Sequence, residues 1–212
     1  MTKGKKAIFL IIAAAGLVSI IMSVYPILMS FFNGGATFVD EASNITIGPD
    51  KYIIGKDIDP GVYDVDVLEG RLTFMQRQLS KQDKVLGLRL NKGEHVDVNG
   101  KGKIKLSPAG FKQVSMGEDG KYDFPHSGFY QVGKQIPEGE YVIFFTDTGQ
   151  EKNKDNEKPF VQVLSPKGKI LQSYNLKGSG TTTVALKKGQ TLEIEKFLFH
   201  ESTNMIVSLK KK

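Results

Sequence analysis

Four aspartates that lie close together in the sequence have the side chains best suited to hold a metal ion. They are Asp57, Asp59, Asp64 and Asp66, and carboxylate oxygens are the ligands that Ca²⁺ prefers. Their spacing does not match an EF-hand loop. Asp64 and Asp66 are two residues apart, which is the spacing of side chains on one face of a β-strand. We therefore interpret the four as a turn and the solvent-facing side of a strand, with calcium binding as the alternative.

The rest of the sequence contains no recognisable catalytic or cofactor-binding pattern. It has no cysteine, which excludes disulfides, thiolate zinc sites and cysteine nucleophiles. The histidines, His95, His126 and His200, lack the short spacing of metal ligands, and no Gly-x-Ser-x-Gly nucleophile elbow is present. We predict a non-enzymatic protein without a cofactor or a metal. An enzyme whose site is assembled from dispersed residues is the alternative.

Two runs rich in lysine and glycine could contact phosphate groups. They occupy residues 100–103 (GKGK) and 166–169 (PKGK). Neither run lies in the strand, GxxxxGK[ST], helix context of a nucleotide-binding loop. We therefore interpret both runs as turns of β-hairpins.

The positive net charge does not indicate a nucleic-acid partner. The chain of 212 residues has a formal net charge of +6. Half of this charge comes from Lys3, Lys5 and Lys6, which leaves +3 for the rest of the chain. The other lysines are spread among turns and alternate with acidic residues, which is typical of a solvated surface. We expect no binding to nucleic acid.

The N-terminal region has the length and polarity of a membrane anchor. Residues 7–32 include no charged residue, and a helix of this length exceeds the hydrocarbon core of about 30 Å. Lysines precede this segment and acidic residues follow it, which places the N-terminus in the cytoplasm. We predict a cytoplasmic tip and a transmembrane helix over residues 1–36, a linker over 37–44, and an extracytoplasmic remainder. The alternative is a signal peptide that is cleaved near residues 34–36.

The remainder of the chain contains an internal repeat. Residues 52–67, YIIGKDIDPGVYDVDV, match residues 130–145, YQVGKQIPEGEYVIFF, at an offset of 78. Six of the first twelve positions are identical, which is more than chance similarity would give. The identical residues are Tyr52, Gly55, Lys56, Ile58, Gly61 and Tyr63 in the first copy and Tyr130, Gly133, Lys134, Ile136, Gly139 and Tyr141 in the second.

A second block recurs farther along each copy. Residues 88–98, LRLNKGEHVDV, match residues 184–194, VALKKGQTLEI, at an offset of 96. The difference between the two offsets gives the second copy 18 more residues between its blocks. The polar run at 149–159 is the predicted insertion, and a solvated loop accounts for it.

The repeated residues are those that turns and strand cores require. Glycine permits positive φ in turns, and alternating apolar residues after each turn predict a strand with one buried face. We predict that each block is a β-hairpin, that Gly61 and Gly139 have positive φ, and that Tyr63 and Tyr141 pack inside. The turn glycines are Gly55, Gly61, Gly93, Gly133, Gly139 and Gly189, and the repeated aromatics are Tyr52, Tyr63, Tyr130 and Tyr141.

No long stretch after the anchor has helical periodicity, whereas strand and turn patterns recur throughout. We therefore predict an N-terminal transmembrane helix followed by an all-β part with two tandem β-sandwich or jelly-roll-like modules. The first module covers residues 45–118. The second covers residues 119–212 and includes the polar loop at 149–159.

The pattern Tyr-x-x-Gly-x-Asp-Ile-x-x-Gly-x-Tyr, followed by Leu-x-x-Gly-x-x-Val-x-Val, resembles a tandem β-repeat of uncharacterised exported and membrane-anchored proteins of Gram-positive bacteria. It covers both modules and consists of turn and core residues, so the resemblance implies a fold and a location but no chemistry. The second copy has Gln135 where the pattern has aspartate. A function that needs Asp57 in both copies is therefore not implied.

These observations predict a non-catalytic protein of a bacterial cell envelope, held in the membrane by one helix with its modules outside. We expect it to bind or assist another envelope protein or a cell-wall polymer. Two alternatives remain open. They are an envelope enzyme with a site between the modules, and a structural spacer in a homo-oligomer.

Overall fold

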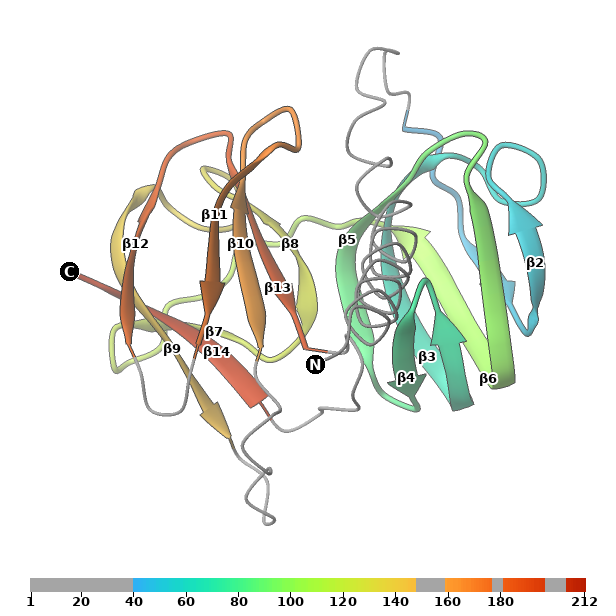
Figure 1. Ribbon diagram of the computed structural model, residues 1–212, viewed down its shortest axis with the longest axis horizontal. Helices are drawn as coiled ribbons and strands as arrows, with labels where there is room; N and C mark the ends of the chain where they lie inside the picture. The colour runs from blue at the N-terminus through green and yellow to red at the C-terminus, as the bar shows by residue number, and fades with distance from the viewer. Residues whose placement is uncertain (1–39, 148–158, 177–180, 197–204) are drawn as a thin grey trace, which may run out of the picture. The chain divides into compact units, whose positions relative to one another are not determined.

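The computed structural model describes residues 40–147, 159–176, 181–196 and 205–212 (Figure 1). The predicted anchor at residues 1–36 lies outside the described residues, as does most of the predicted insertion at 149–159. The described residues contain no helix that is long and apolar enough to span a membrane.

The described part of the chain is all-β, as the sequence predicts. The strands of the first copy are β1 (Ile45–Ile47), β2 (Asp50–Ile53), β3 (Gly61–Phe74), β4 (Arg77–Ser80), β5 (Lys84–Leu90) and β6 (His95–Pro108). The strands of the second copy are β7 (Lys121–Phe124), β8 (Ser127–Gln131), β9 (Gly139–Asp147), β10 (Phe160–Leu164), β11 (Ile170–Asn175), β12 (Thr182–Leu186), β13 (Thr191–Glu195) and β14 (Met205–Lys211).

The strands form a sheet of ten strands and a sheet of four. The main path of the larger sheet runs β1-β6-β3-β5-β8-β13-β10-β11, with β2 paired to β6 and β4 paired to β3. The smaller sheet has the order β12-β9-β14-β7. β5 and β8 pair in parallel. This pairing joins the sheet of the first copy to that of the second.

β3 and β6, with 14 residues each, belong to two layers of the first copy. The first half of β3 pairs with β5 and its second half with β4, while β6 pairs first with β2 and then with β1. The two strands change layer together where Gly70 lies opposite Gly102. A Cβ atom on Gly70 would lie 2.1 Å from the Lys101 carbonyl oxygen, so this crossing needs glycine. One layer is thus β1-β6-β3-β5 and the other is β2-β6-β3-β4.

The second copy has the same strand order, but its two long strands are interrupted. β9 and β10 take the places of the two halves of β3, and β13 and β14 take the places of the two halves of β6. Its layers are therefore β7-β14-β9-β12 and β8-β13-β10-β11. Equivalent residues pair with equivalent partners, because Tyr63 lies opposite Leu88 and Tyr141 lies opposite Val184.

The extra residues of the second copy are divided between two places and do not form one insertion. Equivalent residues of β3 and β9 are 78 positions apart. The separation rises to 87 between Phe74 and Val161, which pair with the equivalent residues Val98 and Ile194. It reaches 96 between β5 and β12. Nine of the 18 extra residues therefore precede β10, in the stretch that contains the predicted loop, and nine follow it.

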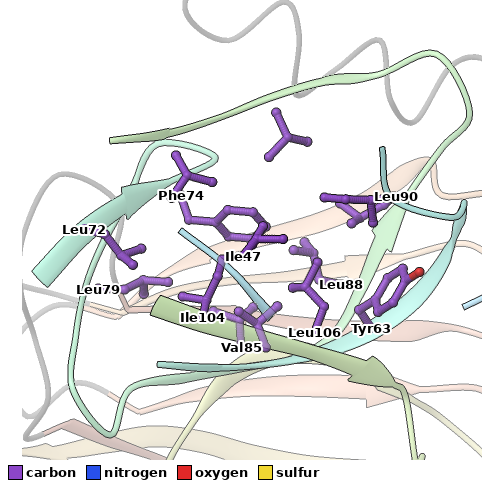
Figure 2. Packing of buried hydrophobic residues seen from close by; sticks show 14 of the residues in the cluster. Ile47, Tyr63, Leu72, Phe74, Leu79, Val85, Leu88, Leu90, Ile104 and Leu106 are labelled. Carbon is purple, nitrogen blue, oxygen red and sulfur yellow. The ribbon is translucent and has the colours of Figure 1, made fainter. Parts of the chain in front are cut away.

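Buried hydrophobic side chains form one cluster in each copy. In the first copy both layers contribute to the same cluster, for example with Phe74 and Leu79 from one layer and Ile104 and Leu106 from the other (Figure 2). These four side chains are 0% exposed. Burial of a side chain of this kind contributes about 1.5 to 3 kcal/mol, so the packed core between the layers is the main source of stability.

The two repeated blocks are not hairpins, and that prediction was wrong. Among the described strands, β2 does not pair with β3 and β5 does not pair with β6. The first block pairs instead with the second, through β2 with β6 and β3 with β5. The connection from β2 to β3 and the connection from β5 to β6 both cross between the layers. They are hydrogen-bonded to each other, because Ile54 N–H donates to the Glu94 carbonyl (2.9 Å) and Gly93 N–H donates to the Ile54 carbonyl (2.8 Å). The blocks recur together because each is the other's partner.

Only one of the two lysine and glycine runs is a hairpin turn. Between β10 and β11, Gly168 N–H donates to the Ser165 carbonyl at 2.8 Å. The other run, residues 100–103, lies within β6, so its interpretation as a turn was wrong. There Gly100 has φ of +109° and Gly102 has φ of +154°. Such backbone conformations let β6 pass from one layer to the other.

Candidate functional site

The repeated tyrosines are structural residues in both copies. Tyr63 and Tyr141 are 0% exposed, and each hydroxyl donates at 2.8 Å to the carbonyl of the residue four positions earlier. The hydroxyls of Tyr52 and Tyr130 do the same, at 3.0 and 2.8 Å. Burial raises the pKa of Tyr63, Tyr130 and Tyr141, so these hydroxyls remain protonated donors. The four aromatics therefore lock turns to strands and are not a platform for a ligand.

Five of the six repeated glycines have positive φ. They are Gly55 (+86°), Gly93 (+87°), Gly133 (+89°), Gly139 (+155°) and Gly189 (+85°). Gly61 does not, so its predicted turn conformation was wrong. It begins β3 beside residues 40–42, and a Cβ atom there would lie 2.6 Å from the Ala42 Cβ and 2.7 Å from Asp40 Oδ1. Gly61 is required by this close approach of the chain and not by its φ.

Asp57 and Gln135 make the same hydrogen bond in the two copies. Asp57 Oδ2 accepts from Ile53 N–H at 2.8 Å, and Gln135 Oε1 accepts from Gln131 N–H at 2.9 Å. The amide of Gln135 also donates to the Lys112 carbonyl at 3.4 Å, which an ionised carboxylate cannot do. Glutamine at this position therefore preserves the hydrogen bond of the turn. It also binds the segment that connects the two copies, at Lys112, to the second copy.

The other aspartates of the predicted cluster have separate partners. Asp59 Oδ2 accepts from the Ser43 hydroxyl at 2.7 Å, and Asp64 Oδ1 accepts from Gly87 N–H at 2.9 Å. Asp66 forms an ion pair with Lys84 at 2.6 Å. Within the described part of the chain, no group of three or more His, Asp or Glu residues is placed to hold a metal ion.

The three histidines lie in different parts of the chain and in different surroundings. His95 is exposed at the start of β6. His126 precedes β8, and its pKa is lowered by burial and by the positive charge of Lys196. His200 lies outside the described residues. Neither His95 nor His126 belongs to a group of three or more His, Asp or Glu residues that could hold a metal ion within the described part of the chain.

The junction between the copies is a parallel pairing of β5 with β8 that two glycines permit. A Cβ atom on Gly128 would lie 2.6 Å from the Leu86 carbonyl oxygen, and one on Gly87 would lie 2.7 Å from the Phe129 carbonyl oxygen. Phe129 packs against the core of the first copy and Leu86 against that of the second. The copies are thus joined by close backbone contact and by one side chain from each copy that packs against the core of the other.

Buried charges line the same junction. Arg77 on β4 and Glu195 on β13 form an ion pair with an Nε to Oε2 distance of 2.6 Å. Lys196 is buried, and its ammonium group donates to the carbonyls of Pro125 and Met205. Burial lowers the pKa of Lys196 to about 8. Burial and the neighbouring Glu195 raise the pKa of Glu193 to about 7, against the opposing effect of Arg77.

Sequence patterns did not reveal this cluster. Glu193 and Glu195 alternate with Leu192 and Ile194 along β13, and this pattern normally indicates a solvated strand face. The face is buried because it adjoins the other copy. Alternation along a strand indicates that its two faces differ, but it does not indicate that another module covers the polar face.

The outer face of the β2-β6-β3-β4 layer carries an open polar surface. Ser80, Arg71 and Lys101 lie opposite one another in one row across the strands β4, β3 and β6. Two residues along each strand, Gln78, Thr73 and Asn99 form a second row on the same face. A shallow depression with a volume of about 190 Å³, open to solvent, follows these rows. We call it the β3–β4–β6 groove. Its lining residues are Arg71, Leu72, Thr73, Gln78, Asn99 and Gly100.

The same face of the fold differs between the copies. Asp97 and Asn99 on β6 are exposed, whereas Glu193 and Glu195, 96 positions later on β13, are buried. In the second copy this face adjoins the junction, and in the first copy it forms the groove. Of these two equivalent faces, the one in the first copy is therefore open to solvent.

No protein-family model matches the chain, and no curated protein is similar to it at a significant level. The two features from which its function can be argued are therefore the buried junction and the open groove. In the junction, Arg77 of the first copy already binds Glu195 of the second, and Lys196 already binds the Met205 carbonyl of its own copy. The groove is lined by the exposed side chains of Arg71, Gln78 and Asn99 and the half-buried Thr73, together with the buried Leu72.

Proposed function

We propose that this protein is a non-catalytic binding protein of a bacterial cell envelope, with two jelly-roll modules held outside the membrane by the N-terminal segment. The uncharged residues 7–32 and the lysines before them support the anchor and its orientation. Eight strand positions in two four-stranded layers, repeated in both copies, support the jelly-roll assignment.

The observation that carries the proposal is the β3–β4–β6 groove. Its polar side chains come from three hydrogen-bonded strands, so their spacing is fixed before a ligand arrives. Preorganised groups lose less entropy on binding than flexible ones. The surface is open and shallow, which fits an extended polymer better than a small molecule that needs enclosure. A cell-wall polymer is the ligand that meets both conditions.

Co-sedimentation of the full-length protein with purified cell-wall sacculi tests this function. We expect the protein in detergent micelles to sediment with sacculi, and Asn99→Trp to abolish this by filling the groove. Thr183→Trp, at an exposed position on β12, is the matched control and should bind normally. Sedimentation that is absent, or equal for both variants, would refute the groove as the binding surface.

An enzyme with a site between the copies is the second candidate, and Glu193 is the observation that favours it. Its raised pKa of about 7 suits a general acid or base at neutral pH. Incubation of sacculi with the full-length protein and with Glu193→Gln distinguishes the two candidates. Release of soluble fragments that depends on Glu193 would support the enzyme, whereas binding without release supports the proposed function.

A further inference from the structure

We propose that two molecules of this protein associate through the outer face of the β7-β14-β9-β12 layer, at its residues on β9, β14 and β7. We call this surface the β9–β14–β7 face. Its exposed and half-buried residues are Val142, Phe144, Ile206, Lys210, Lys121 and Asp123. The face lies on a different layer from the β3–β4–β6 groove, so the inference goes beyond the proposed function.

The first support is a comparison of this face with the equivalent face of the first copy. Asp64 and Asp66 on β3 stand where β9 has Val142 and Phe144, 78 positions later. All four side chains are half-buried. The position itself therefore accepts a charged residue, and the fold does not require an apolar one. The second copy has apolar residues there for another reason.

The same difference extends to the neighbouring strand. Lys103 precedes Ile104 on β6, and Ile206 precedes the equivalent Val207 on β14. Ile206 is half-buried and Lys103 is exposed. Three charged residues of the first copy are thus replaced by apolar residues on one face of the second. Apolar residues gathered on an open face mark an interaction surface.

The second support is the order of the residues on the face, which is complementary to itself. One row across β9, β14 and β7 consists of Val142, Lys210 and Lys121. The next row on the same face consists of Phe144, Ser208 and Asp123. A two-fold axis that crosses the strands between these rows lays each row of one molecule on the other row of the second molecule. Apolar residues then face each other, and both lysines face oxygen acceptors.

The charges favour a second molecule over an anionic lipid surface. Lys210 lies directly opposite Lys121, and like charges on adjacent strands are destabilising. Asp119 forms an ion pair with Lys121, whereas Lys210 forms no ion pair with another described residue. Across the two-fold axis the exposed Asp123 of one molecule would lie beside Lys210 of the other. An anionic lipid surface would instead repel Asp123.

The size of the face indicates a weak dimer. Sheets pack face to face in β-sandwiches, and this face is roughly 14 Å wide and 20 Å long, or about 300 Å². Interfaces of this size belong to transient complexes. If the N-terminal segment holds both molecules in one membrane, as the proposed function has it, their effective concentration rises and a weak contact suffices.

Sedimentation velocity of the full-length protein in detergent micelles, over a range of protein concentrations, tests the inference. We expect the dimer fraction to increase with concentration. Val142→Lys adds a third cation to its row and should raise the dimer dissociation constant about tenfold or more. The matched control is Leu171→Lys, at a residue of β11 that is 47% exposed and lies outside the face. It should change the dissociation constant less than about twofold.

An exchange of two charges tests the two-fold arrangement itself. Asp123→Lys alone should weaken the dimer about tenfold, because it places like charges opposite each other across the axis. The double variant Lys121→Asp with Asp123→Lys exchanges the charges of the two rows and should restore the dissociation constant to within about threefold of the wild type. Melting temperatures show whether each variant remains folded.

Three results would overturn the inference. A wild type that stays monomeric at every concentration, or a dimer that Val142→Lys leaves unchanged, would show that this face does not associate. Equal losses for Val142→Lys and Leu171→Lys would show that only the total charge matters. A charge exchange that fails to restore a folded variant would exclude the two-fold arrangement of the rows.

Discussion

Arg77 of the first copy donates a hydrogen bond from Nε to Glu195 Oε2 of the second copy at 2.6 Å, although 118 residues separate them in the chain. The two side chains are only 10% and 2% exposed. A buried ion pair depends on both partners, because removal of one leaves the other charged and unpaired in a poorly solvated place. Loss of either member should therefore weaken the junction, which the pairing of β5 with β8 also holds together.

Removal of one member of the pair should destabilise the protein strongly. We expect Arg77→Leu or Glu195→Leu alone to lower the free energy of unfolding by about 3 to 5 kcal/mol, and the double variant to lower it by less. Urea denaturation of the full-length protein in micelles measures this. Glu69→Leu, which breaks the exposed pair with Lys103, is the control and should cost less than about 1 kcal/mol. Single variants that behave like this control would contradict the buried pairing.

Glu193 should make stability depend on pH. Its pKa is raised from 4.5 to about 7, so the folded state holds a proton more tightly than the unfolded state does. The contribution of Glu193 to the free energy of unfolding is then greatest below pH 4.5 and decreases as the pH rises to 7, by about 3 kcal/mol in total. Glu193→Gln should remove this decrease and stabilise the protein at pH 8.

The difference between the wild type and Glu193→Gln isolates this effect from two opposing ones. His126, whose pKa is lowered, makes stability increase as the pH rises toward 6.5. Lys196, whose pKa is lowered to about 8, makes it increase between pH 8 and 10.5. Glu140→Gln changes an exposed glutamate on β9 and serves as the control. Parallel stability curves for wild type and Glu193→Gln between pH 5 and 7 would show that Glu193 is not buried as an acid.

The glycines of the junction should control the contact between the copies. Gly128→Ala places a Cβ atom 2.6 Å from the Leu86 carbonyl oxygen, so β5 and β8 should separate while both cores stay folded. Hydrogen exchange of the full-length protein should show faster exchange in β5 and β8 and little change in β3 and β9. Gly110→Ala is the control, because the φ of Gly110 lies outside the positive range and its Cβ atom would lie 3.9 Å from its nearest neighbours, Asp64 Oδ2 and Lys112 Cγ. Unchanged exchange in β5 and β8 would show that the junction tolerates a side chain.

The free edge of β2 lacks the features that make β8 a junction strand. At an offset of 78, Pro49 and Asp50 stand where β8 has Ser127 and Gly128. Proline and charge at a sheet edge oppose the addition of a strand. The contact that joins the two copies is therefore not repeated at this edge, which weakens the alternative of a homo-oligomeric spacer built by head-to-tail pairing.

The mature protein should keep its N-terminal segment. Residues 7–32 are uncharged over a length greater than the apolar region of an ordinary signal peptide. N-terminal sequencing or the intact mass of the membrane-extracted protein measures this. A product that starts near Thr37 and appears in the medium would contradict the anchor.

Sequence patterns predicted the all-β class and the repeat because these depend on local residue types. The pairing of the strands depends on distant contacts, and there the prediction of hairpins failed. Tyr63 and Leu88, which lie opposite each other in β3 and β5, belong to different repeated blocks that were interpreted separately. The groove was missed for the same reason, because Arg71 and Lys101 meet only after β3 and β6 pair.

The two repeated glycines Gly93 and Gly61 should respond differently to substitution. Gly93 has φ of +87° and no atom within 4 Å of a Cβ position, so only its backbone conformation matters. Asparagine tolerates positive φ. Gly93→Asn should therefore cost less than about 1 kcal/mol, whereas Gly93→Val should cost about 1 to 3 kcal/mol.

At Gly61 the obstacle is space, since a Cβ atom would lie 2.6 Å from the Ala42 Cβ. Asparagine also has a Cβ atom, so its tolerance of positive φ does not help there. Gly61→Asn and Gly61→Val should both lower the free energy of unfolding by about 1 to 3 kcal/mol. Thermal unfolding of the four variants of the full-length protein provides the comparison. If asparagine were tolerated equally well at both positions, Gly61 would be a turn residue after all. The close approach of residues 40–42 would then not be what selects glycine at the start of β3.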